Sequence, residues 1–157
     1  MNDKKAKVII WIMKYGKRHL SKNTLFHNLN YLIYKLLNSI IVLGFFGSEI
    51  HSSRSISDNI ILFHPYGIVI SADAKIGDGV IIRQQVTIGN KGLGGIGDKS
   101  PTIEENVEIG AGAKIIGDIT IGAGSKIGAN AVVTKSFPAN SILVGVPAVN
   151  IANKSKT

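Results

Sequence analysis

Aliphatic residues recur at every sixth position through the C-terminal half of the chain. The repeat is clearest at Ile103, Ile109, Ile115, Ile121, Ile127 and Val133. An amphipathic helix repeats its apolar residues at three and four positions, and a half-buried strand at two, so neither element explains this spacing. The pattern is typical of a solenoid in which each hexapeptide forms a short strand and a corner, and three hexapeptides complete one triangular coil. The aliphatic side chains are expected to stack inside.

Two interruptions divide the repeat into three registers. The first register contains Ile50, Ile56, Leu62 and Ile68, and the second, displaced by two residues, contains Ile70, Ile76, Ile82 and Ile88. The third begins at Ile103, which follows Ile88 by 15 residues, where a multiple of six would keep the phase. We therefore expect one extended loop, residues 90–101, to leave the solenoid.

The first 47 residues follow a different pattern. Apolar residues between Leu25 and Ile41 recur at three and four positions, and Asn28, Asn30 and Lys35 lie opposite them. This predicts an amphipathic helix that begins near residues 21–24. The longest apolar run, residues 40–46, is far shorter than the roughly 20 residues that span a bilayer, so no transmembrane anchor is expected.

These patterns predict a mainly β protein in three parts. Residues 1–47 form an N-terminal helical segment, residues 48–151 form the solenoid, and residues 152–157 form a C-terminal tail. A length of 157 residues is that of a single domain or of one domain with an extension.

Charge narrows the range of partners. The formal net charge is +8, which is consistent with a solvated surface, with attraction to anionic lipid, or with steering of a polyanionic ligand such as a nucleotide cofactor. No nucleic-acid partner is expected, because the chain has only three arginines and no helix-turn-helix or stacked-aromatic motif. The basic helical segment either packs on the solenoid or a subunit, the favoured interpretation, or lies on an anionic membrane.

Composition also bears on location. The chain has no cysteine, which excludes disulfides and thiolate metal sites. Met1 is followed by charged residues rather than by a signal-peptide pattern. We expect a cytoplasmic protein, with the inner face of the membrane as its location if the helical segment contacts lipid.

His64 is the main candidate for chemistry. It stands in the sequence FHPYG, which is poor in charge and lies directly before the register shift. An imidazole there can act as a general base for an alcohol if another group holds its second nitrogen, although an ordinary corner histidine is the alternative. No metal is expected, because the coils offer only His51, His64 and Glu49, without a recognisable ligand spacing.

Several motifs resemble those of the hexapeptide-repeat acyltransferases. They are the hexapeptide run, the register shift, the loop, and the ending VTKSFPAN (133–140) followed by GVPA (145–148). Within that family, residues 45–151 look like the serine acetyltransferase branch. The strongest likeness is to the colanic acid and capsule-type polysaccharide O-acetyltransferases, with which they share FFG leading into EI (45–50), TIGN (87–90) and GDIT (117–120).

The resemblance implies a left-handed parallel β-helix, a homotrimer, and acetyl-CoA bound between neighbouring subunits. It also implies that His64, which precedes a Gly-Ile-Val stretch, is the catalytic histidine. A carboxylate fifteen residues earlier orients the histidine in this family, and Glu49 stands at that distance, although the family residue is usually aspartate.

The resemblance further implies where acetyl-CoA binds. Ala111 and Ala129 are small at places where the pantetheine arm is expected to follow the coil. Apart from the resemblance, we expect a backbone amide near Gly89 or Asn90 to stabilise the oxyanion. Thr134 and Lys135 match a Thr-Lys pair near the nucleotide end, and Lys135 can meet a phosphate as a point charge. A solvated lysine is the equal alternative for Lys135.

Two departures from the serine enzymes bear on the acceptor. Phe63 replaces an aspartate that helps to bind the amino acid, and Lys99-Ser100-Pro101 replaces a motif with an Arg-His pair. Leaving the ammonium or carboxylate of serine unpaired in a desolvated site costs roughly 1 to 3 kcal/mol. A sugar hydroxyl instead needs hydrogen bonds and a stacking surface, which Phe63 and Tyr66 offer.

The sequence therefore predicts an O-acetyltransferase that moves an acetyl group from acetyl-CoA directly to a sugar hydroxyl in surface polysaccharide biosynthesis. The sequence does not identify the saccharide. It also does not show whether the saccharide is free, nucleotide-linked or lipid-linked. The alternatives are a serine or a xenobiotic acetyltransferase, and a noncatalytic β-solenoid that serves as an assembly module.

Overall fold

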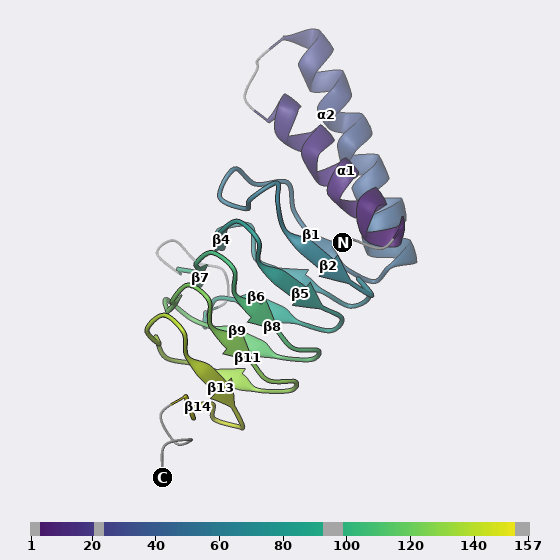
Figure 1. The fold of residues 1–157 in the computed structure, drawn as a ribbon. Helices are drawn as coiled ribbons and strands as arrows, with labels where there is room; N and C mark the ends of the chain where they lie inside the picture. The colour runs from purple at the N-terminus through teal and green to yellow at the C-terminus, as the bar shows by residue number, and fades with distance from the viewer. Residues whose placement is uncertain (1–3, 21–23, 93–98, 153–157) are drawn as a thin grey trace.

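The structure is a computed structural model and describes residues 4–20, 24–92 and 99–152. Helix α1 (Lys4–His19) is followed by α2 (Leu25–Leu37), which continues into the π-helical segment η1 (Asn38–Phe45). In the described part of the chain, fourteen short strands follow and wind into a stack of coils (Figure 1). The helices lie at one end of the stack and the C-terminal residues at the other.

The strands form three sheets, one on each face of the coil. Sheet A contains β1 (Glu49–Ile50), β3 (Val69–Ile70), β6 (Thr87–Gly89), β9 (Lys114–Ile116) and β12 (Val132–Val133). Sheet B contains β4 (Lys75–Ile76), β7 (Thr102–Ile103) and β10 (Thr120–Ile121). Sheet C contains β2 (Ile61–Phe63), β5 (Ile81–Arg83), β8 (Glu108–Ile109), β11 (Lys126–Ile127), β13 (Ile142–Val144) and β14 (Val149–Asn150).

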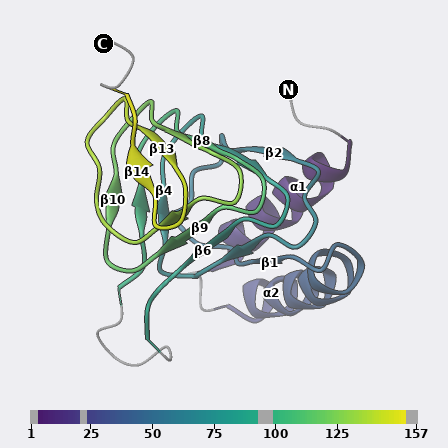
Figure 2. The ribbon, with the colours of Figure 1, turned by 90° about the horizontal axis from the view of Figure 1, so that it is seen from below.

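Among the described residues, every strand except β14 pairs in parallel with the strand one coil away, and β14 pairs antiparallel with β13. Seen along the stack, the coils enclose one common interior (Figure 2). This topology confirms the mainly β solenoid with an N-terminal helical part. The left-handed sense of winding stays a prediction.

The hexapeptide residues fill that interior. In each coil one aliphatic residue per strand points inward, and its neighbours in the strand point outward, because successive side chains alternate across a strand. The inward residues of sheet A are aligned from strand to strand and are fully buried: Ile50, Ile70, Ile88, Ile115 and Val133. The period of six therefore reports one inward side chain for each face of the coil.

The register shift marks a longer corner in the first coil. Eight residues separate the inward Leu62 of sheet C from the inward Ile70 of sheet A. In the second coil the equivalent residues, Ile82 and Ile88, are only six apart. The first corner between these two sheets therefore holds two additional residues, and His64 is in it. The predicted loop 90–101 leaves the coil between β6 and β7, and its residues 93–98 lie outside the described part.

Helix α1 packs on the first coil and on α2. Its buried residues include Ile9, Ile12, Met13 and Gly16. At Gly16 the contact is so close that a Cβ atom would lie 2.6 Å from the Tyr34 ring and 2.8 Å from the Cβ of Ser52. The Ser52 hydroxyl donates to the Met13 carbonyl at 2.7 Å, which also joins α1 to the coil.

Helix α2 starts where the sequence predicts, with Thr24 as its N-cap, but only part of its apolar surface is covered. Tyr34 is buried, whereas the leucines at positions 25, 29, 32 and 36 are exposed. The helical segment therefore packs on the solenoid through α1 and Tyr34, whereas the leucines of α2 face away from the coil. Among the described residues, no helix is long and apolar enough to cross a membrane.

Candidate functional site

His64 lies at the lengthened corner of the first coil, between β2 and β3. Its backbone φ of 49° is in the left-handed region, which side-chain-bearing residues seldom adopt, and its side chain is exposed. The carbonyl of His64 accepts a hydrogen bond from the Tyr66 amide at 2.6 Å. The corner is therefore a tight turn that holds the imidazole on the outside of the coil.

The buried hydroxyl of Ser48 attaches this corner to the start of β1. Ser48 Oγ donates to the Pro65 carbonyl at 3.0 Å and accepts from the Ile68 amide at 3.1 Å. Beside it, the Glu49 amide donates to the Ile68 carbonyl at 2.7 Å. Residues 48–49 and 64–68 therefore run side by side, which brings the backbones of Glu49 and His64 to one corner.

The side-chain pairing of Glu49 with His64 stays a prediction. Within the described part of the chain, no hydrogen bond joins the Glu49 carboxylate to the imidazole. Glu49 instead lines a cavity of about 440 Å³ beneath the helices, together with Tyr34, Lys35 and His51. Burial in that cavity raises the pKa of Tyr34. The Ser52 amide donates to the Tyr34 hydroxyl and partly offsets this rise in the pKa.

The two predicted acceptor-binding rings flank His64 and each contacts a cation. Phe63 is aligned with Arg83 in the next coil, and the guanidinium carbon lies 5.4 Å from the ring centroid. Tyr66 has the ammonium of Lys5 5.0 Å above its ring. Arg83 and Lys5 were not predicted as site residues. Arg83 follows Phe63 by twenty residues, the length of the first coil including its longer corner, and that spacing is the signal that relates them.

Ala111 and Ala129 lie below His64 on the same edge of the stack. We call this edge, formed by the corners that join sheet C to sheet A, the His64 edge. Hydrogen bonds from the Gln85, Gly112 and Asn130 amides to the carbonyls of Tyr66, Gln84 and Ala111 connect its successive corners. Coils in a parallel sheet are about 4.8 Å apart, so Ala111 is about 10 Å below the corner of His64. The small side chains leave room for an extended ligand along this edge.

Asn90, Thr134 and Lys135 lie on a different edge. They follow β6 and β12, so they belong to the corners that join sheet A to sheet B, which we call the Lys135 edge. Thr134 and Lys135 are exposed, and the Lys135 ammonium lies 5.5 Å from the Phe137 ring centroid. A single chain therefore does not bring these residues together with His64.

The residues that end the loop have structural contacts on the Lys135 edge. Lys99 forms an ion pair of 3.3 Å with Asp118, and the Ser100 hydroxyl donates to that of Ser71 at 2.8 Å. Both contacts connect the end of the loop to neighbouring coils. Together with Asp73 and Thr102, Lys99 and Ser100 line a cavity of about 260 Å³.

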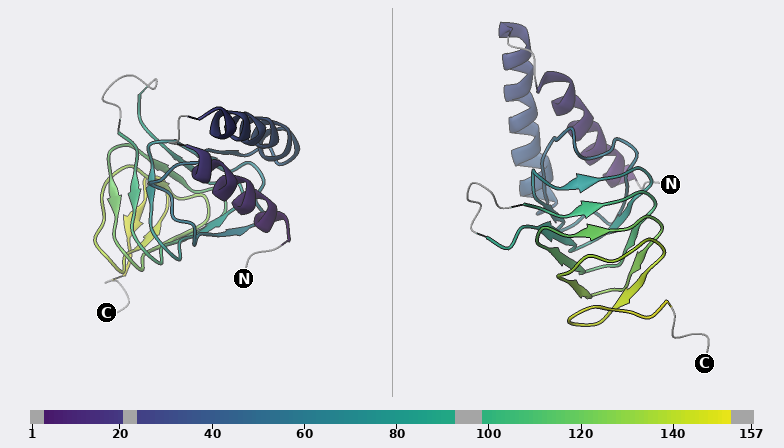
Figure 3. Two further views of the ribbon diagram at one scale, coloured as in Figure 1. Left: turned by 90° about the horizontal axis from the view of Figure 1, so that it is seen from above. Right: turned by 90° about the vertical axis from the view of Figure 1, so that its left-hand side faces the viewer.

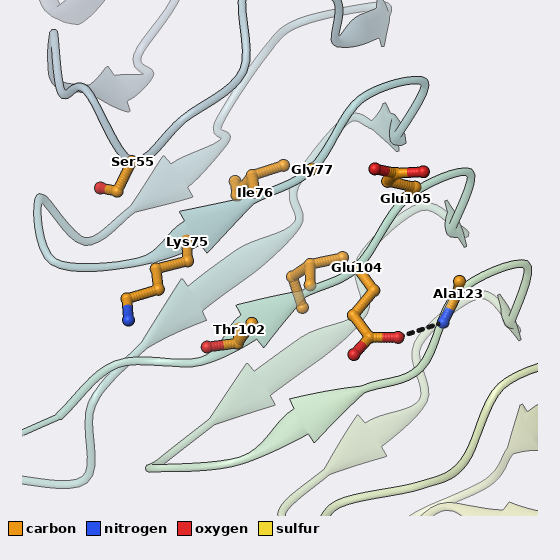
Figure 4. Close-up of a pocket in the computed structure, with 9 residues that line it drawn as sticks. Ser55, Lys75, Ile76, Gly77, Thr102, Glu104, Glu105 and Ala123 are labelled. Carbon is orange, nitrogen blue, oxygen red and sulfur yellow. Dashed lines mark hydrogen bonds between the residues drawn. The ribbon is translucent and has the colours of Figure 1, made fainter.

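A larger groove of about 560 Å³ lies on the outer face of sheet B (Figure 4). Its lining includes Lys75, Thr102 and Glu104, and the Glu104 carboxylate accepts from the Ala123 amide at 2.8 Å. None of the predicted site residues lines it. Across the described residues, no group of three histidine, aspartate or glutamate side chains is placed to hold a metal ion.

Comparison with known proteins identifies the repeat. Residues 100–135 match the family model described as bacterial transferase hexapeptide (six repeats). The serine acetyltransferase of Mycobacterium tuberculosis is 46% identical over 101 residues, which cover 64% of this chain and 44% of that protein. The serine acetyltransferase of Staphylococcus xylosus is 40% identical over 129 residues, which cover 82% of this chain and 59% of that protein.

Solved structures give the same result. The serine acetyltransferase of Brucella abortus in complex with coenzyme A superposes with a TM-score of 0.76 at 35% identity, over 91% of this chain and 54% of that one. The Neisseria gonorrhoeae enzyme in complex with serine gives a TM-score of 0.73 at 32% identity, over 90% and 54%. The chain spans about half the length of these relatives. Residues 100–135 therefore belong to the bacterial transferase hexapeptide family, and the relatives that the longer part of the chain resembles are serine acetyltransferases.

Proposed function

We propose that this chain is an acetyl-CoA-dependent O-acetyltransferase in which His64 activates the hydroxyl of the acceptor. The observation that carries the proposal is the position of His64, held outward at the lengthened corner by the Ser48 hydrogen bonds, above an edge lined by Ala111 and Ala129. The names of the relatives support acetyl transfer as the reaction and acetyl-CoA as the donor.

The reaction that we propose is direct transfer. A nitrogen of His64 removes the hydroxyl proton while the oxygen attacks the thioester carbonyl. The carbon–sulfur bond then breaks, and the imidazolium returns the proton to the departing thiolate of CoA. Glu49 would hold the imidazole in the tautomer that accepts the proton. A backbone amide near Gly89 or Asn90 would stabilise the oxyanion.

This mechanism requires more than one copy of the chain. Gly89 and Asn90 lie at the opposite ends of the sheet A strands from His64, so the amide and His64 meet only if the Lys135 edge of a second subunit faces the His64 edge of the first. We propose a homotrimer with three such inter-subunit sites, in which Thr134 and Lys135 of one subunit approach the nucleotide end of acetyl-CoA.

Serine is the acceptor that the relatives' names support best. A sugar hydroxyl of a surface polysaccharide is the second candidate, and Phe63 is the observation that favours it. The ring of Phe63, with Arg83 beside it, stands next to His64 and cannot pair with an ammonium group. Rings beside a catalytic histidine suit the apolar face of a sugar.

A CoA-release assay with wild-type protein and the His64→Ala variant tests the chemistry. We expect acetyl-CoA turnover with an acceptor in the wild type and loss of at least about a thousandfold in the variant, which is within the typical effect of a general base. His27→Ala, which changes a histidine on α2, serves as the control and should keep full activity. Near-normal turnover by His64→Ala would exclude the proposed base.

The same assay distinguishes the acceptors. L-serine, neutral and acidic oligosaccharides, and hydroxyl-bearing antibiotics are offered separately at equal concentration. Turnover with serine alone supports a serine acetyltransferase, and turnover with saccharides alone supports the polysaccharide enzyme. If CoA does not raise the melting temperature and no acceptor is acetylated, the noncatalytic assembly module is the better description.

A further inference from the structure

The positive charge of the chain is concentrated in its N-terminal helical segment. Residues 1–47 contain eight of the 18 lysines and arginines but only one of the ten acidic residues. The solenoid and the tail are close to neutral, because their basic and acidic residues nearly balance. Almost the whole net charge of +8 therefore lies in less than a third of the chain.

The same segment exposes a continuous apolar surface, which we call the leucine face. It consists of seven residues of α2 and η1: Leu25, Phe26, Leu29, Leu32, Ile33, Leu36 and Ile40. Their exposed fractions run from 41% for Ile33 to 88% for Leu25. The residues recur at three and four positions, so they share one side of the helix. Figure 3 shows α2 beside α1 at the end of the stack, without a further element over its outer side.

Helix α1 adds a basic and aromatic surface next to the leucine face. Lys4, Lys7, Trp11 and Arg18 recur at helical spacing and are all exposed, with Trp11 58% exposed. Within α1 the Trp11 ring stacks on Tyr15 at 5.7 Å, and the Tyr15 hydroxyl donates to Asn30 of α2 at 2.5 Å. The His19 ring at the end of α1 lies 6.3 Å from the ring of Phe26, so the exposed surface of α1 adjoins the leucine face at Phe26.

The basic residues on this surface are available to a partner. Lys17, on the inner side of α1, forms an ion pair with Asp58 and donates to the Ile56 carbonyl. By contrast, Lys4, Lys7 and Arg18 form no ion pair with any residue that the structure describes.

We propose that the helical pair docks the protein on an anionic membrane surface. Exposed leucines beside lysines and a tryptophan are the composition of helices that lie in the membrane interface, with the apolar face among the acyl chains and the cations at the headgroup phosphates. A second copy of the chain is the less favourable occupant, because it would bring two strongly basic segments together.

Vesicle co-sedimentation of the full chain tests this proposal. Vesicles of phosphatidylcholine alone are compared with vesicles of phosphatidylcholine and phosphatidylglycerol in equal parts, at low and at high salt. We expect the protein to sediment with the anionic vesicles, to stay in solution with the neutral ones, and to be released by salt, since surface charges are screened over about 10 Å at 0.1 M.

Two variants identify the surface. The triple variant Leu29→Gln/Leu32→Gln/Leu36→Gln keeps good helix formers and should lose at least tenfold in vesicle affinity. The matched control, Ile142→Gln/Val149→Gln, changes exposed apolar residues at the opposite end of the molecule and should bind as the wild type does. If the triple variant has a lowered melting temperature, the variant Lys4→Gln/Lys7→Gln/Arg18→Gln provides a second, independent test. It should also lose vesicle binding.

Three results would overturn the proposal. The first is a wild-type protein that does not bind anionic vesicles, and the second is binding by both variants as tight as that of the control. The third is a triple variant that light scattering finds in a smaller assembly than the wild type, while vesicles have no effect. That last result would assign the leucine face to a contact between copies of the chain.

Discussion

Ser48 is the residue whose contacts fix the corner of His64. Its buried hydroxyl satisfies the Pro65 carbonyl and the Ile68 amide, and both groups would be left without that partner in a Ser48→Ala variant. Loss of such a hydroxyl costs about 1 to 3 kcal/mol. We expect Ser48→Ala to lower the melting temperature and also to lower kcat, because the turn that holds the imidazole loosens.

Ser125 provides the matched control for this prediction. It is equally buried, and its hydroxyl donates to the Pro138 carbonyl and accepts from the Ser141 amide, three coils away from His64. Ser125→Ala should therefore lose comparable stability but keep the kcat of the wild type. Equal loss of kcat in both variants would show that Ser48 acts only through stability.

Tyr34 is expected to make the stability of the fold decrease at alkaline pH. Burial raises its pKa above the ordinary value of 10.0, so the folded state holds the phenol proton more tightly than the unfolded state does. The stabilisation is complete below pH 10 and is lost as the pH rises through the folded-state pKa. Melting temperatures measured from pH 8 upwards should fall above pH 10, and less steeply in Tyr34→Phe than in Tyr66→Phe. Parallel declines in the two variants would refute this role of Tyr34.

Among the secondary-structure elements, α1 depends on a glycine for its position on the coil. A Cβ atom at Gly16 would lie 2.6 Å from the Tyr34 ring, which no side chain tolerates without movement. We expect Gly16→Ala to cost about 1 to 3 kcal/mol, because overpacking forces α1 and α2 apart. Urea unfolding measures the effect. Gly89→Ala, where a Cβ would meet nothing within 4 Å, should change stability much less.

The coil could be predicted from the sequence because each face contributes one inward residue per turn. Ile109, Ile115 and Ile121 are six residues apart and lie on three different sheets, so the spacing alone revealed the three-sided stack. The register shift was also readable. It predicted an irregularity at His64, and the structure identifies this as a corner with two more residues than the corners below it.

The helical segment was predicted less completely, for a physical reason. Spacing of three and four shows which residues of α2 share a side, but not what covers that side. Tyr34, rather than the leucines, faces the coil, because Gly16 and Ser52 leave a place for its ring and the Ser52 amide donates to its hydroxyl. Ser48 and Arg83 were missed because their partners are one coil away and no local pattern marks them.

At the scale of the whole molecule, the predicted site residues separate into two groups. His64, Ala111 and Ala129 follow the His64 edge, whereas Asn90, Thr134 and Lys135 follow the Lys135 edge. The two edges lie on either side of sheet A, so one acetyl-CoA molecule that touches both groups must lie between two subunits. The proposed function and the trimer therefore depend on each other.

Mixing two inactive variants tests this dependence. His64→Ala removes the base from one edge, and Lys135→Glu reverses the charge that we expect near the cofactor on the other. If each site takes one edge from each of two neighbours, mixed trimers contain some sites in which both edges are intact. Random assembly from equal amounts should restore about a quarter of the wild-type sites.

Release of CoA after joint refolding measures the restoration, and each variant refolded alone is the control. Without any restoration in a mixture that forms trimers, the site would have to lie within one chain, and the assignment of Lys135 to acetyl-CoA binding would be wrong.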